Sequence, residues 1–294
     1  MEALSDLIST FRMRVDVYHN AKICGNWLYR ETHLGETSFH MVTLGECQLD
    51  IPGHMNTVLR LGDLVIFPRE IPHSMQPLTA KTGKQEALPF DQAIDLDGTG
   101  MLCGQAIFDH QGSFHLIDAL PAAFIVRHCA KNTWCDALVN MIMTESVAPN
   151  IASQAIINRL SELVFVYALR QHLHESDGNI GILALYGDAR LKMAITAIHT
   201  TPDASWTLES LANAANMSRT AFAKKFRQIS GWTPAKYLAW WRMQLAWRKL
   251  SEGMVSAEVA EQVGYKSEAA FSRAFQKQFN TTAGKVRRKE SLKG

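Results

Sequence analysis

At 294 residues the chain is long enough for two average domains, and its 47% hydrophobic content supports packed cores and excludes a disordered protein. The five cysteines have no framework spacing, which indicates a reducing compartment rather than a disulfide scaffold. The N-terminal sequence MEALSDLISTF lacks the pattern of a signal peptide, and no apolar run approaches the ~20 residues of a membrane helix. We therefore expect a cytoplasmic protein without a membrane partner.

The net charge of +2 conceals two parts of opposite sign. From Gly187 to the end the sequence has 18 Lys and Arg against 8 Asp and Glu, a balance of +10, and the remaining residues have 12 against 20, a balance of −8. An acidic first part followed by a basic second part favours contact between the second part and a polyanion. A tail that is basic only for solubility gives the same balance, so charge alone leaves both interpretations open.

Residues 27–108 have the pattern of short strands. Apolar or alternating runs are separated by Gly and Pro turns: FHMVTL, CQLDI, TVLRL, DLVIF and MLCGQAIF. Such a series predicts an antiparallel sandwich or barrel. Residues 79–100, TAKTGKQEALPFDQAIDLDGTG, lack apolar periodicity, and we expect them to form a long surface loop.

After residue 121 the apolar spacing becomes helical. The runs WCDALVNMIMTES and ASQAIINRLSELVFVYALRQHL predict two amphipathic helices. The second run carries a broad apolar stripe, made of Leu160, Leu163, Val164, Tyr167 and Ala168. That stripe is either intramolecular core or half of a two-fold dimer interface. The segment ESDGNIG is the linker candidate, and from residue 188 onward the sequence indicates short helices only.

One segment of the basic part occurs twice, as MSRTAFAKKFRQISG and as KSEAAFSRAFQKQFN. Aligning Ser218 with Ser267 also aligns a pair of phenylalanines in each copy. Each serine is a good helix N-cap, and phenylalanines four residues apart share one buried face. The outward positions of the first copy are then Arg219, Thr220, Ala223, Lys224 and Arg227. Those of the second copy include Ala269, Ser272 and Arg273.

Another short helix and a tight turn precede each copy, TLESLANAANM and SAEVAEQVGY. This order is the plan of a helix-turn-helix unit, whose second helix enters the major groove of DNA. Lys224 and Arg273 hold matching places, from which a cation reaches guanine acceptors or phosphates. The small Ala223 and Ser272 let the helix backbone approach the bases. A single unit is equally explained by a helical hairpin with a solvated face, but two units with matched cations favour DNA binding.

The segment TPAKYLAWWRMQLAWRKLSEG lies between the two units. Thr233 is its predicted N-cap, and Pro234 suits the first helical position. About 18 residues at 1.5 Å each make a rod of ~27 Å. A rigid spacer of that size can set two recognition helices in successive major grooves, ~34 Å apart along one face of DNA.

Residues 188–288 closely resemble the DNA-binding domain of AraC/XylS-type bacterial transcription regulators, on the repeated helix-turn-helix segments quoted above. The resemblance implies a seven-helix domain whose base-contacting positions fall here on Thr220, Ala223 and Lys224, and on Ala269, Ser272 and Arg273. The end of the second unit departs from the family, which usually has Gly, then Thr-Pro and an aromatic residue, where this chain has Asn280, Thr282-Ala283 and Val286.

The first 185 residues resemble the cupin-type sensor domain of one AraC subgroup, because GDLVIFPREIPH is similar to the second cupin motif. The first cupin motif, with two metal-binding histidines one residue apart, is missing. His40, His54 and His73 remain without tight ligand spacing, so we expect structural histidines, no metal site and no cofactor. Whether any of the three binds a metal stays open.

Within this subgroup the chain resembles activators that respond to reactive chlorine species. Cys24, in AKICGNW, and Cys103, in MLCGQAIF, fall where those regulators carry their redox-sensing pair. The resemblance implies that thiolate oxidation changes the packing of the sensor. Small apolar packing is the alternative role for both cysteines, and it is the role expected of Cys47, Cys129 and Cys135.

Together these observations predict two domains, an N-terminal all-β cupin-like barrel followed by amphipathic helices and a C-terminal all-α domain with two helix-turn-helix units joined by a long helix. The predicted boundaries are 1–120 for the barrel, 121–177 for a helical dimerisation region, 178–187 for a linker and 188–294 for the DNA-binding domain. The predicted function is transcription regulation, as an activator that senses an oxidant or a small molecule. The expected partners are promoter DNA, RNA polymerase and a second copy of the chain. The alternative is a metal-dependent cupin enzyme with an accessory helical domain.

Overall fold

The protein divides into two bodies, each described here by itself. One spans Met13–Ile107 and Leu120–Glu175, and the other consists mainly of Ser176–Gly294. The computed structural model describes residues 6–7, 10, 13–31, 36–79, 82–93, 95–108, 120–128, 133–175 and 181–291. None of the helices within these ranges is both long and apolar enough to cross a membrane.

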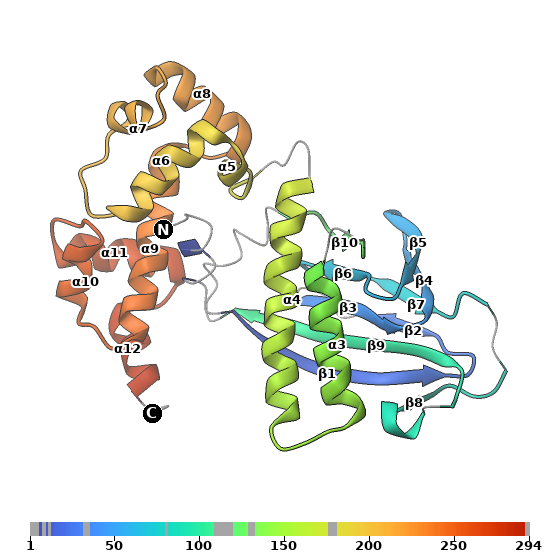
Figure 1. Ribbon diagram of the computed structural model, residues 1–294. Helices are drawn as coiled ribbons and strands as arrows, with labels where there is room; N and C mark the ends of the chain where they lie inside the picture. The colour runs from blue at the N-terminus through green and yellow to red at the C-terminus, as the bar shows by residue number, and fades with distance from the viewer. Residues whose placement is uncertain are drawn as a thin grey trace. The chain divides into compact units, whose positions relative to one another are not determined.

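Two β-sheets face each other in the first body (Figure 1). The larger sheet has the strand order β10-β6-β3-β9-β1-β8. Its strands are β1 Met13–Cys24, β3 Thr37–Leu44, β6 Leu64–Phe67, β8 Glu86–Leu88, β9 Gly98–Phe108 and β10 Phe124–Val126. The smaller sheet has the order β2-β7-β4-β5. Its strands are β2 Tyr29–Glu31, β4 Glu46–Ile51, β5 Met55–Arg60 and β7 His73–Gln76.

The chain changes sheets at Gly45, between β3 and β4, where a φ of +73° favours glycine. Strand β4 then alternates strictly, with Cys47, Leu49 and Ile51 buried and the residues between them half-exposed. These three join a core cluster between the sheets that includes Trp27 and Phe67. The alternating runs of the sequence therefore correspond to strands of a cupin-like sandwich, as predicted.

The prediction of a long loop over residues 79–100 was wrong in part. Strand β8 lies within it and pairs with the end of β1, with Lys22 opposite Leu88 and Cys24 opposite Glu86. A short 3-10 helix, Phe90–Gln92, follows and buries Phe90. An edge strand of three residues is too short to give a periodic signal, so the sequence pattern missed it.

Helices α3, Thr133–Val147, and α4, Ser153–Glu175, lie side by side against β1 (Figure 1). Side chains of α4 hold the strand directly, because backbone N–H groups of Val15 and Val17 donate to Glu162 and Asn158. Because one side of α4 packs against β1, only part of its predicted apolar stripe is buried. Leu160, Val164 and Ala168 are buried, whereas Leu163 is 48% exposed.

The second body is helical throughout its described part. Its helices are α5 Ala184–Gly187, α6 Ala189–Thr200, α7 Leu208–Ala214, α8 Arg219–Ser230, α9 Pro234–Ser251, α10 Ser256–Gln262, α11 Glu268–Phe279 and α12 Ala283–Ser291. Residues 181–187, which the sequence placed in the linker, fold against this body: Gly181 donates to the carbonyl of Ile229, and Leu185 and Tyr186 are buried. Helix α12 forms although Ala283 and Val286, both within it, differ from the residues usual in the family, and both are buried.

Candidate nucleic-acid interface and barrel interior

Helix α8 is an amphipathic helix with caps at both ends. The hydroxyl of Ser218 accepts from the backbone N–H of Ala221, and Gly231 ends the helix with a φ of +71°. Phe222 and Phe226 are fully buried. The opposite face carries the predicted DNA-binding residues, of which Arg219, Thr220, Lys224 and Arg227 are exposed and Ala223 is half-buried.

Helix α11 repeats this design in the second unit. Ser267 accepts from Ala270 N–H, and Asn280 ends the helix in the left-handed region at φ +51°. Phe271 and Phe275 are buried. The predicted contact residues Ala269, Ser272 and Arg273 are all exposed. Each recognition helix thus offers a polar face that is open to a partner.

The turn before each recognition helix has a residue with positive φ, Asn216 at +52° in the first unit and Gly264 at +78° in the second. The same hydrogen bond follows each of them: Met217 N–H donates to Ala212, and Tyr265 N–H donates to Ala260. Gly264 also lies against a loop, because a Cβ there would be 2.8 Å from the backbone oxygen of Asp203. Both turns therefore have helix-turn-helix geometry.

Helix α9 joins the two units as the predicted rigid spacer of 18 residues, with Thr233 as N-cap and Pro234 in its first turn. Its buried Tyr237 packs on Phe226 of α8, with ring centroids 5.9 Å apart. Near its other end, Trp247 lies 5.8 Å from Phe275 of α11. One straight helix therefore contacts the buried face of both recognition helices.

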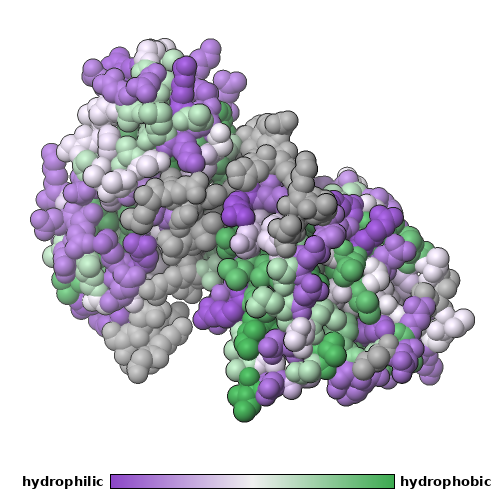
Figure 2. Space-filling model, in the orientation of Figure 1, coloured by the Kyte–Doolittle hydropathy of each residue, from purple (hydrophilic) through white to green (hydrophobic). Residues whose placement is uncertain are grey.

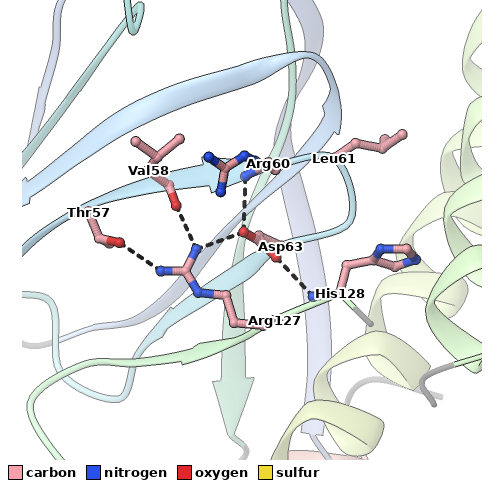
Figure 3. A pocket seen from close by; sticks show the side chains of 7 residues that line it. All are labelled: Thr57, Val58, Arg60, Leu61, Asp63, Arg127 and His128. Carbon is pink, nitrogen blue, oxygen red and sulfur yellow. Dashed lines mark hydrogen bonds and ion pairs between the residues drawn. The ribbon is translucent and has the colours of Figure 1, made fainter. Parts of the chain in front are cut away.

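A pocket of about 630 Å³ lies at the edge of the first body (Figure 3). Arg127 donates to Asp63 at 2.7 Å, to the carbonyl of Val58 at 2.6 Å and to Thr57 at 2.7 Å. Asp63 also accepts from the backbone N–H of His128 at 2.9 Å. These bonds tie the segment after β10 to the β5–β6 turn. Asp63 belongs to the Gly-Asp turn of GDLVIF, within the segment that resembles the second cupin motif. Its partner Arg127 was not predicted from the sequence.

Inside the barrel, His40 on β3 and His73 at the start of β7 come together from different sheets. Both are buried, and their Nε2 atoms are 3.1 Å apart. Glu70, also buried, brings Oε1 to 3.2 Å from Nδ1 of His73. Burial, and secondly the neighbouring His73, lower the pKa of His40 to about 3. His54, the third histidine considered from the sequence, is exposed in the β4–β5 turn.

A cavity of about 190 Å³ adjoins this histidine pair. Its lining residues are Tyr18, His19, Ile23, Trp27, Tyr29, Met75, Met101 and Cys103. The ring of Tyr29 connects the two features, because its centroid is 5.5 Å from that of His40 and 6.0 Å from that of His73. The cavity is mostly aromatic and apolar, with a thiol and two ring hydroxyls, and is large enough for a small effector.

The two predicted sensing cysteines are both buried but lie apart. A Cβ built on Gly98 of β9 would be 3.0 Å from Sγ of Cys24, so Cys24 lies beside Gly98 on the neighbouring strand. Cys103 is five residues further along β9, about 16 Å at ~3.3 Å per residue. A disulfide needs Cα atoms within ~7 Å. The folded barrel therefore does not bring this pair within bonding distance.

Burial also determines the protonation of the interior thiols. It raises the pKa of Cys47 to about 12 and raises the pKa of Cys103 further. Cys135 is buried and donates to the carbonyl of Gly62 at 3.2 Å, consistent with its predicted packing role. Cys129 lies outside the described residues.

Comparison with known proteins identifies both bodies. A cupin family model matches residues 2–174, and a helix-turn-helix domain model matches residues 211–289. The chain belongs to the AraC-like transcription regulators with an N-terminal cupin domain.

Curated relatives of this family match almost the whole chain. The RCS-specific HTH-type transcriptional activator RclR of Escherichia coli is 27% identical over 98% of this chain and 97% of its own length. The HTH-type transcriptional regulator AlkR of Acinetobacter baylyi is 28% identical over 95% and 96%. Among solved structures, ToxT from Vibrio cholerae matches 94% of this chain and 97% of its own at 10% identity, with a TM-score of 0.38.

This membership confirms the predicted fold class, with a β-rich cupin domain before a helical DNA-binding domain. The relatives are named as regulators of transcription, so the chain is a DNA-binding regulator and the alternative of a cupin enzyme is rejected. Glu70 was not predicted as a partner of the histidines, because its place in PREIPH, three residues before His73, does not have the spacing of a known ligand motif.

Proposed function

We propose that this regulator binds promoter DNA as a homodimer through α8 and α11, and that an effector acting on the barrel controls that binding. The observation that carries this proposal is the pair of matched, exposed recognition faces on one rigid spacer. In this account Lys224 and Arg273 reach base edges or phosphates, and Arg219 and Arg227 neutralise phosphates. Activation through contact with RNA polymerase and association with the nucleoid belong to the same proposal.

The proposed dimer surface is the outer face of α3 and α4. Met141 is 53% exposed and Leu163 48% exposed, and Ile156 lies on the same α4 face, since residues seven apart in a helix are neighbours along one stripe. Figure 2 shows hydrophobic side chains gathered over these helices. A second copy of the chain is the occupant that we propose, because a self-complementary apolar stripe suits a two-fold contact.

For the effector, two chemistries have support: oxidation of Cys24 or Cys103, and a small molecule in the cavity beside Tyr29. The relative RclR is named as RCS-specific, which favours an oxidant. The ~16 Å between the cysteines favours a switch in which each thiol acts by itself, or in which the barrel opens before a disulfide forms.

The test is DNA binding to the promoter region next to the protein's own coding sequence. The protein is compared reduced and after slightly more than one equivalent of hypochlorous acid, together with Cys24→Ser and Cys103→Ser. A reversible change in affinity or footprint that either substitution abolishes supports oxidant sensing. Equal binding by all preparations rejects it and leaves the cavity ligand as the effector.

A further inference from the structure

The histidine pair in the barrel has the geometry of two ligands to one ion. Nδ1 of His73 is 2.9 Å from the carbonyl oxygen of Ile71, and because a carbonyl only accepts, Nδ1 carries a ring proton. Nε2 of His73 therefore faces Nε2 of His40 across 3.1 Å. In the absence of a metal, one proton between the rings holds them together. A metal ion can replace that proton, since two nitrogen ligands of a tetrahedral zinc lie ~3.3 Å apart.

A carboxylate completes the cluster. The ligand atoms of His40, Glu70 and His73 all lie within 4.8 Å of one another, which places three potential donors around one point. Oε1 of Glu70 is buried and, apart from its 3.2 Å approach to Nδ1 of His73, has no hydrogen-bond partner within the described residues. A buried carboxylate oxygen with so little compensation is costly, and a bound ion is one of the standard reasons for it.

The surroundings of His73 match those of a metal-binding histidine. Such a histidine donates its second ring N–H to a carbonyl or carboxylate, which fixes the ring and its tautomer. His73 does so to Ile71, and its ring also stacks on Phe67 with centroids 4.1 Å apart. The ring is thus fixed before any ion arrives.

We propose that the barrel binds one divalent first-row transition metal ion through Nε2 of His40, Nε2 of His73 and the carboxylate of Glu70. Imidazole ligands favour this class of ion over calcium and magnesium, which prefer oxygen. Because His40 belongs to the six-stranded sheet and His73 to the four-stranded sheet, the ion links the two sheets. Three protein ligands leave a coordination position for a small molecule, and the cavity lined by Tyr29 and Cys103 lies next to the site.

The test is titration of the full-length, metal-stripped protein with Zn²⁺ by calorimetry and with Co²⁺ by visible absorption. We expect one ion per chain, Co²⁺ bands of a nitrogen and oxygen site without an intense thiolate charge-transfer band, and a higher Tm of the barrel with metal. His40→Gln and His73→Gln are expected to lower the affinity at least ten-fold. His54→Gln is the matched control, because this histidine is exposed and outside the cluster.

Circular dichroism establishes that each variant is folded. Should His40→Gln or His73→Gln not fold, the wild-type titration decides, together with Glu70→Gln as a milder change. The proposal is overturned if the wild type binds neither ion stoichiometrically, if the Co²⁺ spectrum shows thiolate ligation, or if folded His73→Gln binds like the wild type. These measurements need no DNA, so their failure leaves the proposed DNA-binding function untouched.

Discussion

Lys224 on α8 and Arg273 on α11 occupy the same position of their helices, six residues after the N-cap serine and two residues before a buried phenylalanine. Both side chains are exposed. This equivalence links the sequence repeat to a proposed mechanism, in which each helix presents one cation at the same depth in its groove.

Replacing these cations tests that mechanism. We expect Lys224→Ala and Arg273→Ala each to weaken specific DNA binding by ~1–3 kcal/mol, because each removes a contact to a base or phosphate. Arg60→Ala is the matched control, since it removes one exposed positive charge from the barrel. Fluorescence anisotropy at fixed salt measures the effect. Wild-type affinity in both test variants would show that these side chains do not contact DNA.

Two glycines of the DNA-binding body are expected to respond in opposite directions. Gly264→Ala places a Cβ on a residue with positive φ, which costs about 1–2 kcal/mol, and brings that Cβ against the backbone of Asp203. We therefore expect this substitution to destabilise the second unit. Gly284, in α12, has open space around it, and Gly284→Ala should stabilise by roughly 0.5–1 kcal/mol. Thermal unfolding followed by tryptophan fluorescence compares them. Equal shifts in Tm would contradict the turn geometry.

The reduced, folded barrel should protect its interior thiols. Because burial raises the pKa values of Cys47 and Cys103, little thiolate exists at pH 7, and alkylation should be much slower than in the unfolded chain. Mass spectrometry after a timed iodoacetamide pulse gives the rates. Under native conditions we expect no intrachain Cys24–Cys103 disulfide, and finding one in protein of native circular dichroism would contradict the strand register.

The same raised pKa gives stability a pH dependence. A thiol whose folded pKa is above its unfolded value of ~8.5 contributes stability that is fully present below pH ~8.5 and is lost as pH rises toward the folded value, about 12 for Cys47. Denaturation of the wild type between pH 8 and 10 should therefore show a decline that Cys47→Ala reduces. A pH profile unchanged by the substitution would reject this assignment.

If the apolar face of α3 and α4 forms the dimer interface, charged substitutions on it should disrupt the dimer. Leu163→Glu and Met141→Glu should shift the protein from dimer to monomer, since each places a charge where the partner's apolar surface would bury it. Leu61→Glu is the control, because Leu61 is 50% exposed in the β5–β6 turn. Light scattering after size exclusion reports the mass. If the control and test variants keep the wild-type mass, the dimer forms elsewhere.

Local patterns account for what the sequence predicted. Helix caps and buried phenylalanine pairs depend on neighbours within a few residues, so their spacing in the sequence was enough to identify them. The caps found in this way are Ser218, Thr233 and Ser267. The histidine–glutamate cluster joins β3 to a loop 30 residues later, and only the pairing of β3 with β6 determines that meeting. For the same reason, the distance between Cys24 and Cys103 follows from strand register, which the residue pattern does not specify.

Footprinting on the protein's own promoter is the most direct test of whether both recognition helices read one DNA site. We expect protection over two major-groove segments ~34 Å apart on one face of the duplex. Lys224→Ala should lose protection mainly in one segment, and Arg273→Ala mainly in the other. A footprint that both variants leave intact, or one that covers a single groove segment and responds only to Lys224→Ala, would contradict the claim.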